Sequence, residues 1–311
     1  MVRSELPNFL RDPMDRNPHA KNLDNLKRAQ SECFGVVVNS FYELHPAYCD
    51  LFRQTECQRA WFCGPYTAWP RTEDDEEEDA AASKGDRSSW MAWLDEQATA
   101  SVVYVGFGSF IYFTKQQHWE MARGLEASGR PFLWVLKESE FAGGGEGWLP
   151  EGFEERMGES GRGLLVRNWA PQPEILSHGS TAAFLTHCGW NSVLEGLVSG
   201  VPLIGWPMAA EQFYNSKMLE EELGVSVELA RGPVAEVSSP EVASVVRQVI
   251  AGERGEDMRR RAATCSDMIR AATQEGDHKP GASIKALDDF LEEAASARRA
   301  TTATRPAARK K

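Results

Sequence analysis

The segment from residue 182 to residue 192 places polar side chains where an apolar strand ends and a helix begins. Residues 182–186 are predicted to form a buried strand, and a helix is expected to open at Asn191 and Ser192. The first turn of a helix carries unpaired backbone N–H groups and a partial positive charge, which favour a phosphate. Gly189 permits a close backbone turn, and His187 and Ser192 add side-chain donors. These residues predict a diphosphate cradle.

The wider segment 169–212 begins with Trp-Ala-Pro-Gln, has His-Cys-Gly-Trp-Asn-Ser at its centre and closes with Glu-Gln. It resembles, without a gap, the signature box of plant UDP-dependent glycosyltransferases that modify small lipophilic metabolites. The resemblance implies that His187, Asn191 and Ser192 contact the pyrophosphate of a UDP-sugar. It also implies a second phosphate-contacting loop at Gly106-Phe107-Gly108-Ser109, with Ser109 as the donor. A Gly-x-Gly pair alone would be a weak signal.

Two further side chains suit the nucleoside of such a donor. Trp169 offers a flat face for uracil, and base–aromatic stacking contributes about 1–3 kcal/mol. Glu195 lies one helical turn beyond Asn191 on the same predicted face, where a carboxylate can accept hydrogen bonds from both ribose hydroxyls. Either residue alone would more often be a packing or solvated residue. Their joint spacing favours the donor site.

The sugar is expected at the end of the segment. Glu211 and Gln212 present acceptors and donors that suit sugar hydroxyls. In the resembled family, a closing glutamine and a tryptophan at the Trp190 position are typical of glucose users, so UDP-glucose is the expected co-substrate. The resemblance adds Ala170 and Gln172 to the donor-binding residues. By contrast, three other residues are interpreted as packing residues: Trp61, Trp134 and Cys188.

The composition narrows the class of protein. The 311 residues carry a net charge of −12 and are 42% hydrophobic, which is ample for a core and argues against non-specific nucleic-acid binding. The six cysteines contain no Cys-x-x-Cys pair, so free thiols in a reducing compartment are expected. The first twenty residues lack the apolar stretch of a signal peptide, and the chain has no predicted membrane span. These features predict a cytoplasmic protein.

Strand and helix patterns alternate from Trp90 onward, which predicts an α/β protein with a doubly wound parallel sheet. The predicted strands are 101–106, 132–136, 163–166, 182–186, 202–205 and 225–228. This part resembles the complete carboxyl-terminal Rossmann-like domain of a GT-B glycosyltransferase. The expected division is a remnant of the amino-terminal acceptor domain at 1–65, an acidic linker at 66–89, the UDP-sugar-binding domain at 90–294 and a disordered basic tail at 295–311.

The general base of glycosyl transfer is not identified. The resembled family uses a His–Asp pair in its amino-terminal domain, with the histidine directly after the first apolar strand. No such strand precedes His19 or His45, so neither is interpreted as the base, and the chain is expected to be truncated at its amino terminus. The remaining histidines at 118, 178 and 278 are predicted to lie at the surface. Because the chain has no Asp-x-Asp pair, a metal-dependent sugar-nucleotide site is not expected, and neither is a cofactor.

Three hypotheses follow. The first is a metal-independent, inverting glucosyltransferase that acts on a hydroxyl of a small lipophilic acceptor. The second is a truncated homologue that binds UDP-sugar but lacks the His–Asp pair and transfers nothing. The third is a fragment that does not fold stably, because it exposes apolar surface. A dehydrogenase is excluded, because the early loop lacks the full G-x-G-x-x-G pattern.

Overall fold

The computed structural model describes residues 18–69, 87–137, 147–276 and 279–303. These residues form two compact units. The first, here called the sheet unit, comprises the described residues from 87 to 266. The second, here called the split unit, combines residues 18–69 with the described residues from 267 onward.

The sheet unit is built on a six-stranded, wholly parallel sheet with the strand order β5-β4-β3-β6-β7-β8. Its strands are β3 (Val102–Gly106), β4 (Phe132–Leu136), β5 (Gly163–Arg167), β6 (Thr181–Thr186), β7 (Leu203–Gly205) and β8 (Ser226–Glu228). Every residue of β3 and β6 is buried, as continuous apolar runs in a parallel sheet should be. The predicted doubly wound α/β sheet is confirmed, and each predicted strand lies within one or two residues of the observed one.

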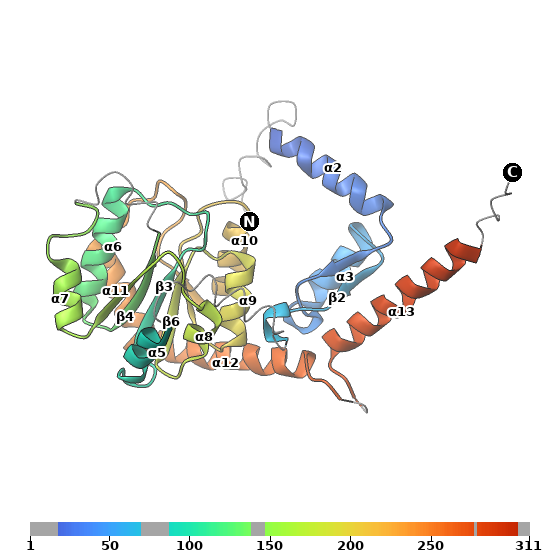
Figure 1. Cartoon of the computed structure of the whole chain (residues 1–311). Helices are drawn as coiled ribbons and strands as arrows, with labels where there is room; N and C mark the ends of the chain where they lie inside the picture. Colours follow the sequence, from blue (N-terminus) through green and yellow to red (C-terminus); the bar gives the residue numbers. More distant parts are fainter. Residues whose placement is uncertain (1–17, 70–86, 138–146, 277–278, 304–311) are drawn as a thin grey trace, which may run out of the picture. The chain divides into compact units, whose positions relative to one another are not determined.

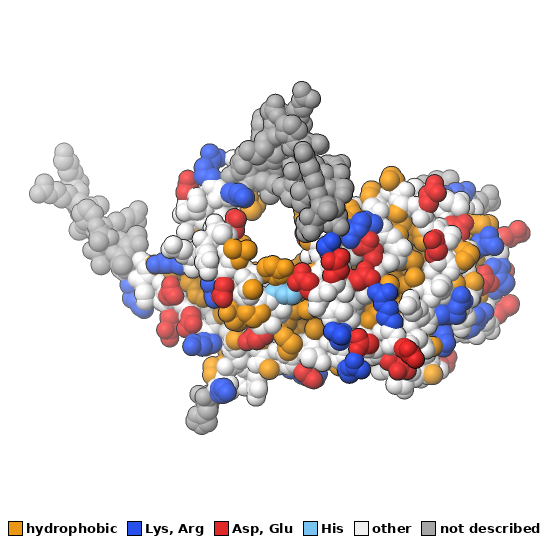
Figure 2. Space-filling model, turned by 180° about the vertical axis from the view of Figure 1, so that it is seen from behind, with side chains coloured by type: hydrophobic (Ala, Val, Ile, Leu, Met, Phe, Trp, Pro, Cys, Tyr) orange, Lys and Arg blue, Asp and Glu red, His pale blue; other side chains and the backbone are white. Residues whose placement is uncertain are grey.

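Helices cover both faces of this sheet (Figure 1). On one side lie α6 (Lys115–Ser128), α7 (Phe153–Glu159) and α11 (Ser239–Ala251), and on the other α8 (Gln172–Ser177), α9 (Trp190–Val198) and α10 (Gln212–Lys217). The remaining helices are α5 (Arg87–Asp95), a π-helical turn at Met218–Glu222 and α12 (Glu253–Ala272). Acidic and basic side chains intersperse over the face of the sheet unit seen in Figure 2.

The start of α6 shows how the sequence sets these helices. Thr114 caps the helix: its hydroxyl accepts from the Gln117 backbone N–H, and the Gln117 side chain accepts in return from the Thr114 backbone N–H. Gly124 then lets α11 approach closely, because a Cβ there would lie 2.4 Å from Cβ of Val242. His118, predicted at the surface, is buried, and its ring stacks on Trp134 at 5.9 Å. That prediction was wrong because His118 lies on the face of α6 that carries Met121, Ala122 and Leu125 into the core.

The split unit pairs two short parallel strands, β1 (Val36–Val38) and β2 (Ala60–Phe62). Its helices are α2 (Pro18–Glu32), α3 (Pro46–Thr55) and α13 (Ala282–Ala303), with 3₁₀ turns at Tyr42–Leu44 and Tyr66–Ala68. The last helix packs on β2: the Phe290 and Trp61 rings lie 5.2 Å apart, and the buried Ser283 hydroxyl donates to the Gly64 carbonyl oxygen at 2.6 Å. The carboxyl-terminal helix therefore belongs to the core of the amino-terminal segment.

The observed division differs from the expected one at its far end. Residues 267–294 were assigned to the donor domain, but they group with residues 18–69 because α13 buries its apolar face there. Residues 295–303, predicted to be disordered, continue α13, since this stretch contains alanine and arginine, which favour helix. The acidic run at 73–79 and residues 304–311 lie outside the described residues.

Candidate functional site

The candidate site lies at the carboxyl ends of β3 and β6, which are neighbours at the centre of the sheet. The chain runs from β3 toward β4 on one side and from β6 toward β7 on the other, so the connections diverge at this point. Open parallel sheets bind ligands at such a switch point. The loops that leave the two strands, residues 107–113 and 187–189, contain the two predicted phosphate-contacting segments.

His187 is enclosed by two glycine backbones that these loops contribute. A Cβ on Gly108 would lie 2.9 Å from His187 Cε1, and a Cβ on Gly189 would lie 2.4 Å from His187 Nε2. Gly108 also has a φ of +63°, a conformation that side chains other than glycine rarely adopt. The structure therefore brings the Gly106–Ser109 corner and His187 together, with Ser109 exposed beside them.

The environment of His187 keeps its imidazole neutral. Burial, with a smaller contribution from the positive charge of Lys137, lowers the pKa of His187 to about 4. Lys137 directly follows β4, its ammonium group donates to the Ile111 carbonyl oxygen, and it lies 4.5 Å from the centre of the Tyr112 ring. Sequence reasoning missed Lys137. The available signal was its position, since it comes directly after a predicted strand of the same sheet.

A hydrogen-bonded cluster connects three predicted residues. The Gln172 side-chain nitrogen donates to the Ser192 hydroxyl at 3.2 Å and to the Glu195 carboxylate. The Gln172 side-chain oxygen accepts a 3.2 Å hydrogen bond from the hydroxyl of Tyr104, a buried residue of β3. The spacing of Ser192 and Glu195 within α9 places both against the start of α8. Sequence reasoning missed Tyr104, because within an apolar strand it resembles any other core residue.

The start of the signature segment lies between β5 and α8. Asn168 adopts a φ of +67°, and the chain then passes through the half-buried Trp169 and the buried Ala170 into α8. Trp190, also half-buried, and the exposed Asn191 form the first turn of α9, for which Gly189 is the N-cap residue. All of these positions lie at the carboxyl edge of the sheet.

The two residues expected to contact the sugar differ in their surroundings. Glu211 is exposed. The side-chain oxygen of Gln212 accepts from the backbone N–H groups of Met208 and Ala209, at 2.9 and 3.0 Å. The carbonyl of Gln212 therefore stabilises the turn before α10.

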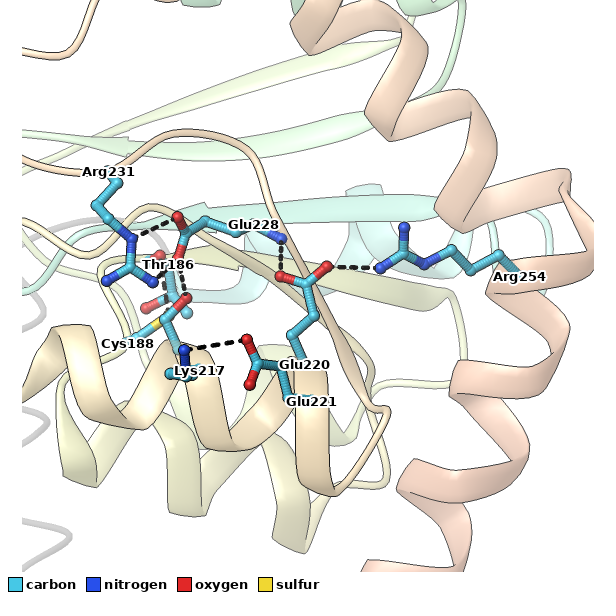
Figure 3. A network of polar contacts seen from close by, with 9 residues as sticks. Thr186, Cys188, Lys217, Glu220, Glu221, Glu228, Arg231 and Arg254 are labelled. Carbon is cyan, nitrogen blue, oxygen red and sulfur yellow. Dashed lines mark hydrogen bonds and ion pairs between the residues drawn. The ribbon is translucent and has the colours of Figure 1, made fainter. Parts of the chain in front are cut away.

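A polar network supports the loop after β6 from behind (Figure 3). Cys188 has a φ of +62°, and its carbonyl oxygen accepts a 2.9 Å hydrogen bond from the Asn215 side chain. The next residue, Ser216, donates to Glu228 at 2.7 Å, and Glu228 in turn forms a 2.6 Å ion pair with Arg231. Burial raises the pKa of the Cys188 thiol to about 12, so this residue packs rather than reacts. The predicted packing roles of Trp61, Trp134 and Cys188 are confirmed, since all three are buried.

The other described histidines belong to other elements. His178 precedes β6, so it is at the amino end of the sheet, where its side chain is 22% exposed and pairs with Asp95 at 3.1 Å. His178, predicted to lie at the surface, is thus partly buried. His45 is the N-cap residue of α3 in the split unit. His19 lies in α2, and His278 falls outside the described residues.

The described residues contain no group of three or more histidine, cysteine, aspartate or glutamate side chains placed to hold a metal ion. None of the helices in this part of the chain is both long and apolar enough to cross a membrane.

Comparison with protein families gives a match over residues 19–262 to the family described as UDP-glucoronosyl and UDP-glucosyl transferase. Among individual relatives, UDP-glycosyltransferase 73B4 of Arabidopsis thaliana is 39% identical over 90% of this chain and 58% of its own length. Scopoletin glucosyltransferase of Nicotiana tabacum is 39% identical over 94% of this chain and 60% of its own length. The chain thus spans a little under two thirds of these relatives.

Solved structures of similar proteins agree with the fold. UGT2 of Phytolacca americana, in complex with UDP-2-fluoro-glucose and pterostilbene, superimposes with a TM-score of 0.76 at 35% identity, covering 93% of this chain and 60% of that one. UGT73P12 of Glycyrrhiza uralensis, in complex with glycyrrhetinic acid 3-O-monoglucuronide, gives a TM-score of 0.84 at 31% identity, covering 97% and 61%. The α/β fold predicted from the sequence is therefore that of these GT-B transferases.

Proposed function

Because the chain belongs to the family of UDP-glucoronosyl and UDP-glucosyl transferases, we propose that its sheet unit binds UDP-glucose and that the protein donates the glucose to a hydroxyl of a small lipophilic acceptor. The reaction would invert the anomeric carbon and need no metal. The observation that carries the proposal is the cluster of Gln172, Ser192 and Glu195 beside His187 at the switch point of the sheet.

Each part of this edge suits one part of the donor. The first turn of α9, the Ser192 hydroxyl, the neutral His187 imidazole and Ser109 would hold the diphosphate through N–H and O–H donors. A neutral imidazole is adequate here, because one ring nitrogen still carries a proton to donate. Glu195 would accept from the ribose hydroxyls, and Trp169 would stack on the uracil.

The sugar would lie near the turn before α10. Gln212 offers its amide nitrogen, the exposed Glu211 offers its carboxylate, and Trp190 offers an aromatic face on the first turn of α9. A glutamine with its carbonyl already engaged discriminates among hydroxyls only as a donor. Glucose is proposed because the residues at 190 and 212 are those that the sequence resemblance associates with glucose.

The acceptor class is inferred from relatives. Two relatives of similar identity are named for scopoletin and for abscisate, and the solved UGT2 complex holds pterostilbene. We propose an acceptor of this kind, a small lipophilic molecule with a hydroxyl group. The catalytic residues are not assigned. Binding of UDP-sugar without transfer is the alternative function. It is favoured because neither described histidine of the amino-terminal segment directly follows an apolar strand: His19 lies in α2, and His45 is the N-cap residue of α3.

The location proposed for the protein is the cytoplasm. Free thiols persist in a reducing compartment, whereas secreted proteins oxidise them to disulfides. The described cysteines are all free: Cys33, Cys49, Cys57, Cys63, Cys188 and Cys265.

The first test is calorimetric titration of the full chain with UDP-glucose. We expect saturable binding that weakens about 10- to 100-fold in Trp169→Ala, the equivalent of a lost base stack. Glu195→Ala should weaken binding as well. Trp119→Ala is the matched control, because Trp119 lies on α6 and contacts Arg123 instead of the candidate site. A folded wild-type chain that does not bind UDP-glucose would refute the proposal.

A second assay separates transfer from binding alone. The full chain is incubated with UDP-glucose and a panel of phenolic, terpenoid and hormone-like acceptors, and glucoside formation is followed by mass spectrometry. Glucoside formation that is lost in Glu195→Ala supports the transferase. Tight UDP-glucose binding with no glucoside on any acceptor supports the alternative.

A further inference from the structure

Tyr104 carries a buried hydroxyl in the middle of the sheet. This hydroxyl bonds to Gln172, one of the residues proposed to form the nucleotide site. It lies in β3 and is 2% exposed, and its ring stacks on Phe184 of β6 with centroids 5.1 Å apart. Burial raises the pKa of its hydroxyl, so the proton is retained and available for donation.

The backbone of Gly106 lies close to this hydroxyl and to the Gln172 side chain. A Cβ added to Gly106 would lie 3.0 Å from the Tyr104 oxygen and 3.2 Å from the Gln172 side-chain oxygen. Gly106 therefore leaves just enough space for the contact between Tyr104 and Gln172, and the stacked ring cannot swing away without displacing Phe184. Gly106 and Phe184 therefore both restrict the Tyr104 side chain that makes the 3.2 Å hydrogen bond to Gln172.

The donor and acceptor roles in this hydrogen-bonded cluster follow from the chemistry of the Glu195 carboxylate. An ionised carboxylate such as that of Glu195 can only accept hydrogen bonds, so the Gln172 group that faces it must be the NH₂ group. The Gln172 carbonyl must then face Tyr104, which must donate to it. The same NH₂ group donates to the Ser192 oxygen, so the proton of Ser192 is directed elsewhere.

We propose that Tyr104 is a positioning residue of the donor site, whose hydroxyl holds the Gln172 amide in the one orientation that fixes Glu195 for the ribose and turns the Ser192 proton toward the diphosphate. This inference rests on the proposed function. In this proposal Tyr104 makes no direct contact with the nucleotide. Its contribution is to restrict Gln172, and through it Glu195, to a single geometry before the ligand arrives.

The test is Tyr104→Phe in the full chain, titrated calorimetrically with UDP and with 2′,3′-dideoxy-UDP. Removing the hydroxyl leaves the Gln172 carbonyl unpaired, so the amide rotates and Glu195 loses its fixed orientation. We expect UDP affinity to fall about tenfold, the effect of one lost hydrogen bond to a buried group, while affinity for the dideoxy analogue falls much less. The preference for the ribose hydroxyls should therefore shrink, a result that a general loss of packing would not produce.

Two further variants sharpen the test. Tyr214→Phe is the matched control: it also removes a buried hydroxyl from the sheet unit, one without a hydrogen-bond partner among the described residues, and should leave both affinities unchanged. In a Glu195→Ala background, Tyr104→Phe should no longer change the ribose preference, because the group it positions is gone.

The outcomes separate this inference from the proposed function. If the wild-type chain does not bind UDP, the proposed function fails. If the wild type binds UDP but Tyr104→Phe weakens UDP and the dideoxy analogue equally, or weakens neither, Tyr104 does not position Glu195 and the inference is overturned.

Discussion

His187 is the single side chain in which the packing and the proposed chemistry of the site meet. Two glycine backbones enclose its ring, and Lys137 adds a positive charge nearby. Both effects disfavour the imidazolium ion, so the pKa of His187 falls to about 4. At neutral pH the imidazole is therefore uncharged, and one ring nitrogen keeps a proton.

This environment makes stability depend on pH. Between the unfolded pKa of 6.5 and the folded pKa of about 4, His187 is protonated in the unfolded chain but neutral in the folded chain. The free energy of unfolding should therefore fall as the pH drops through this window, by about 2–3 kcal/mol, and stay level above it as far as His187 is concerned. Urea denaturation at pH 7 and pH 4.5 measures the difference. His187→Gln should lose this part of the pH dependence of stability, and His178→Gln should keep it. If the free energy of unfolding falls equally with pH in the wild type and in His187→Gln, the effect does not come from His187.

The junction between β6 and α9 is the element that organises the site. The strand ends at Thr186, the backbone turns through the positive φ of Cys188, and α9 begins two residues later with its N–H groups at the carboxyl edge of the sheet. The Asn215 side chain donates to the Cys188 carbonyl oxygen, and the Ser216 hydroxyl donates to Glu228, so these residues support the turn. The geometry of the turn depends on the close approach of Gly189 to the His187 ring.

Two glycine substitutions in this element should affect different properties of the protein. In Gly189→Ala the new Cβ would lie 2.4 Å from His187 Nε2, so the imidazole must move and we expect UDP affinity to fall about tenfold, the effect of one misplaced hydrogen bond. In Gly196→Ala the new Cβ meets Leu203 at an ordinary 3.6 Å, so α9 should gain up to about 1 kcal/mol with no change in UDP affinity. Thermal unfolding and calorimetric titration of both variants check this. Unchanged UDP binding in Gly189→Ala would show that the His187 position does not matter.

At the scale of the whole molecule, the described residues form two units with separate cores. All proposed donor contacts come from the sheet unit, residues 109 to 212. The split unit brings residues 18–69 and 267–303 together around β2, with Phe290 against Trp61 and Ser283 bonded to Gly64. A ligand that binds one unit stabilises that unit by mass action.

Phe290→Ala should therefore separate the unfolding transitions of the two units in a calorimetric scan. Losing the ring that packs on Trp61 removes about 2 kcal/mol from the split unit, whereas Leu291→Ala, at a position 53% exposed, should remove little. Saturating UDP should raise only the transition of the sheet unit, and its affinity should be the same in both variants. A drop in UDP affinity in Phe290→Ala alone would mean that the site depends on the split unit.

The sequence by itself determined where the strands of the sheet unit lie. The strands were predictable because a buried parallel strand is a short apolar run between turn residues, as at Val102–Gly106 and Thr181–Thr186, and burial leaves that pattern locally. The parallel sheet followed from the alternation of strands and helices. The spacing of residues 187, 191, 192 and 195 further predicted that these side chains would gather at one strand end, since helix periodicity is also local.

Tertiary structure decided everything that depends on which distant segments meet. Tyr104 and Gln172 are 68 residues apart, and they meet only because β6, and the segment leading into it, crosses to lie beside β3. The burial of His118 and the packing of α13 on β2 depend in the same way on partners far along the chain. Local patterns record that a side chain is buried, but the identity of its neighbour is set by strand order and helix docking, which no single window of sequence contains.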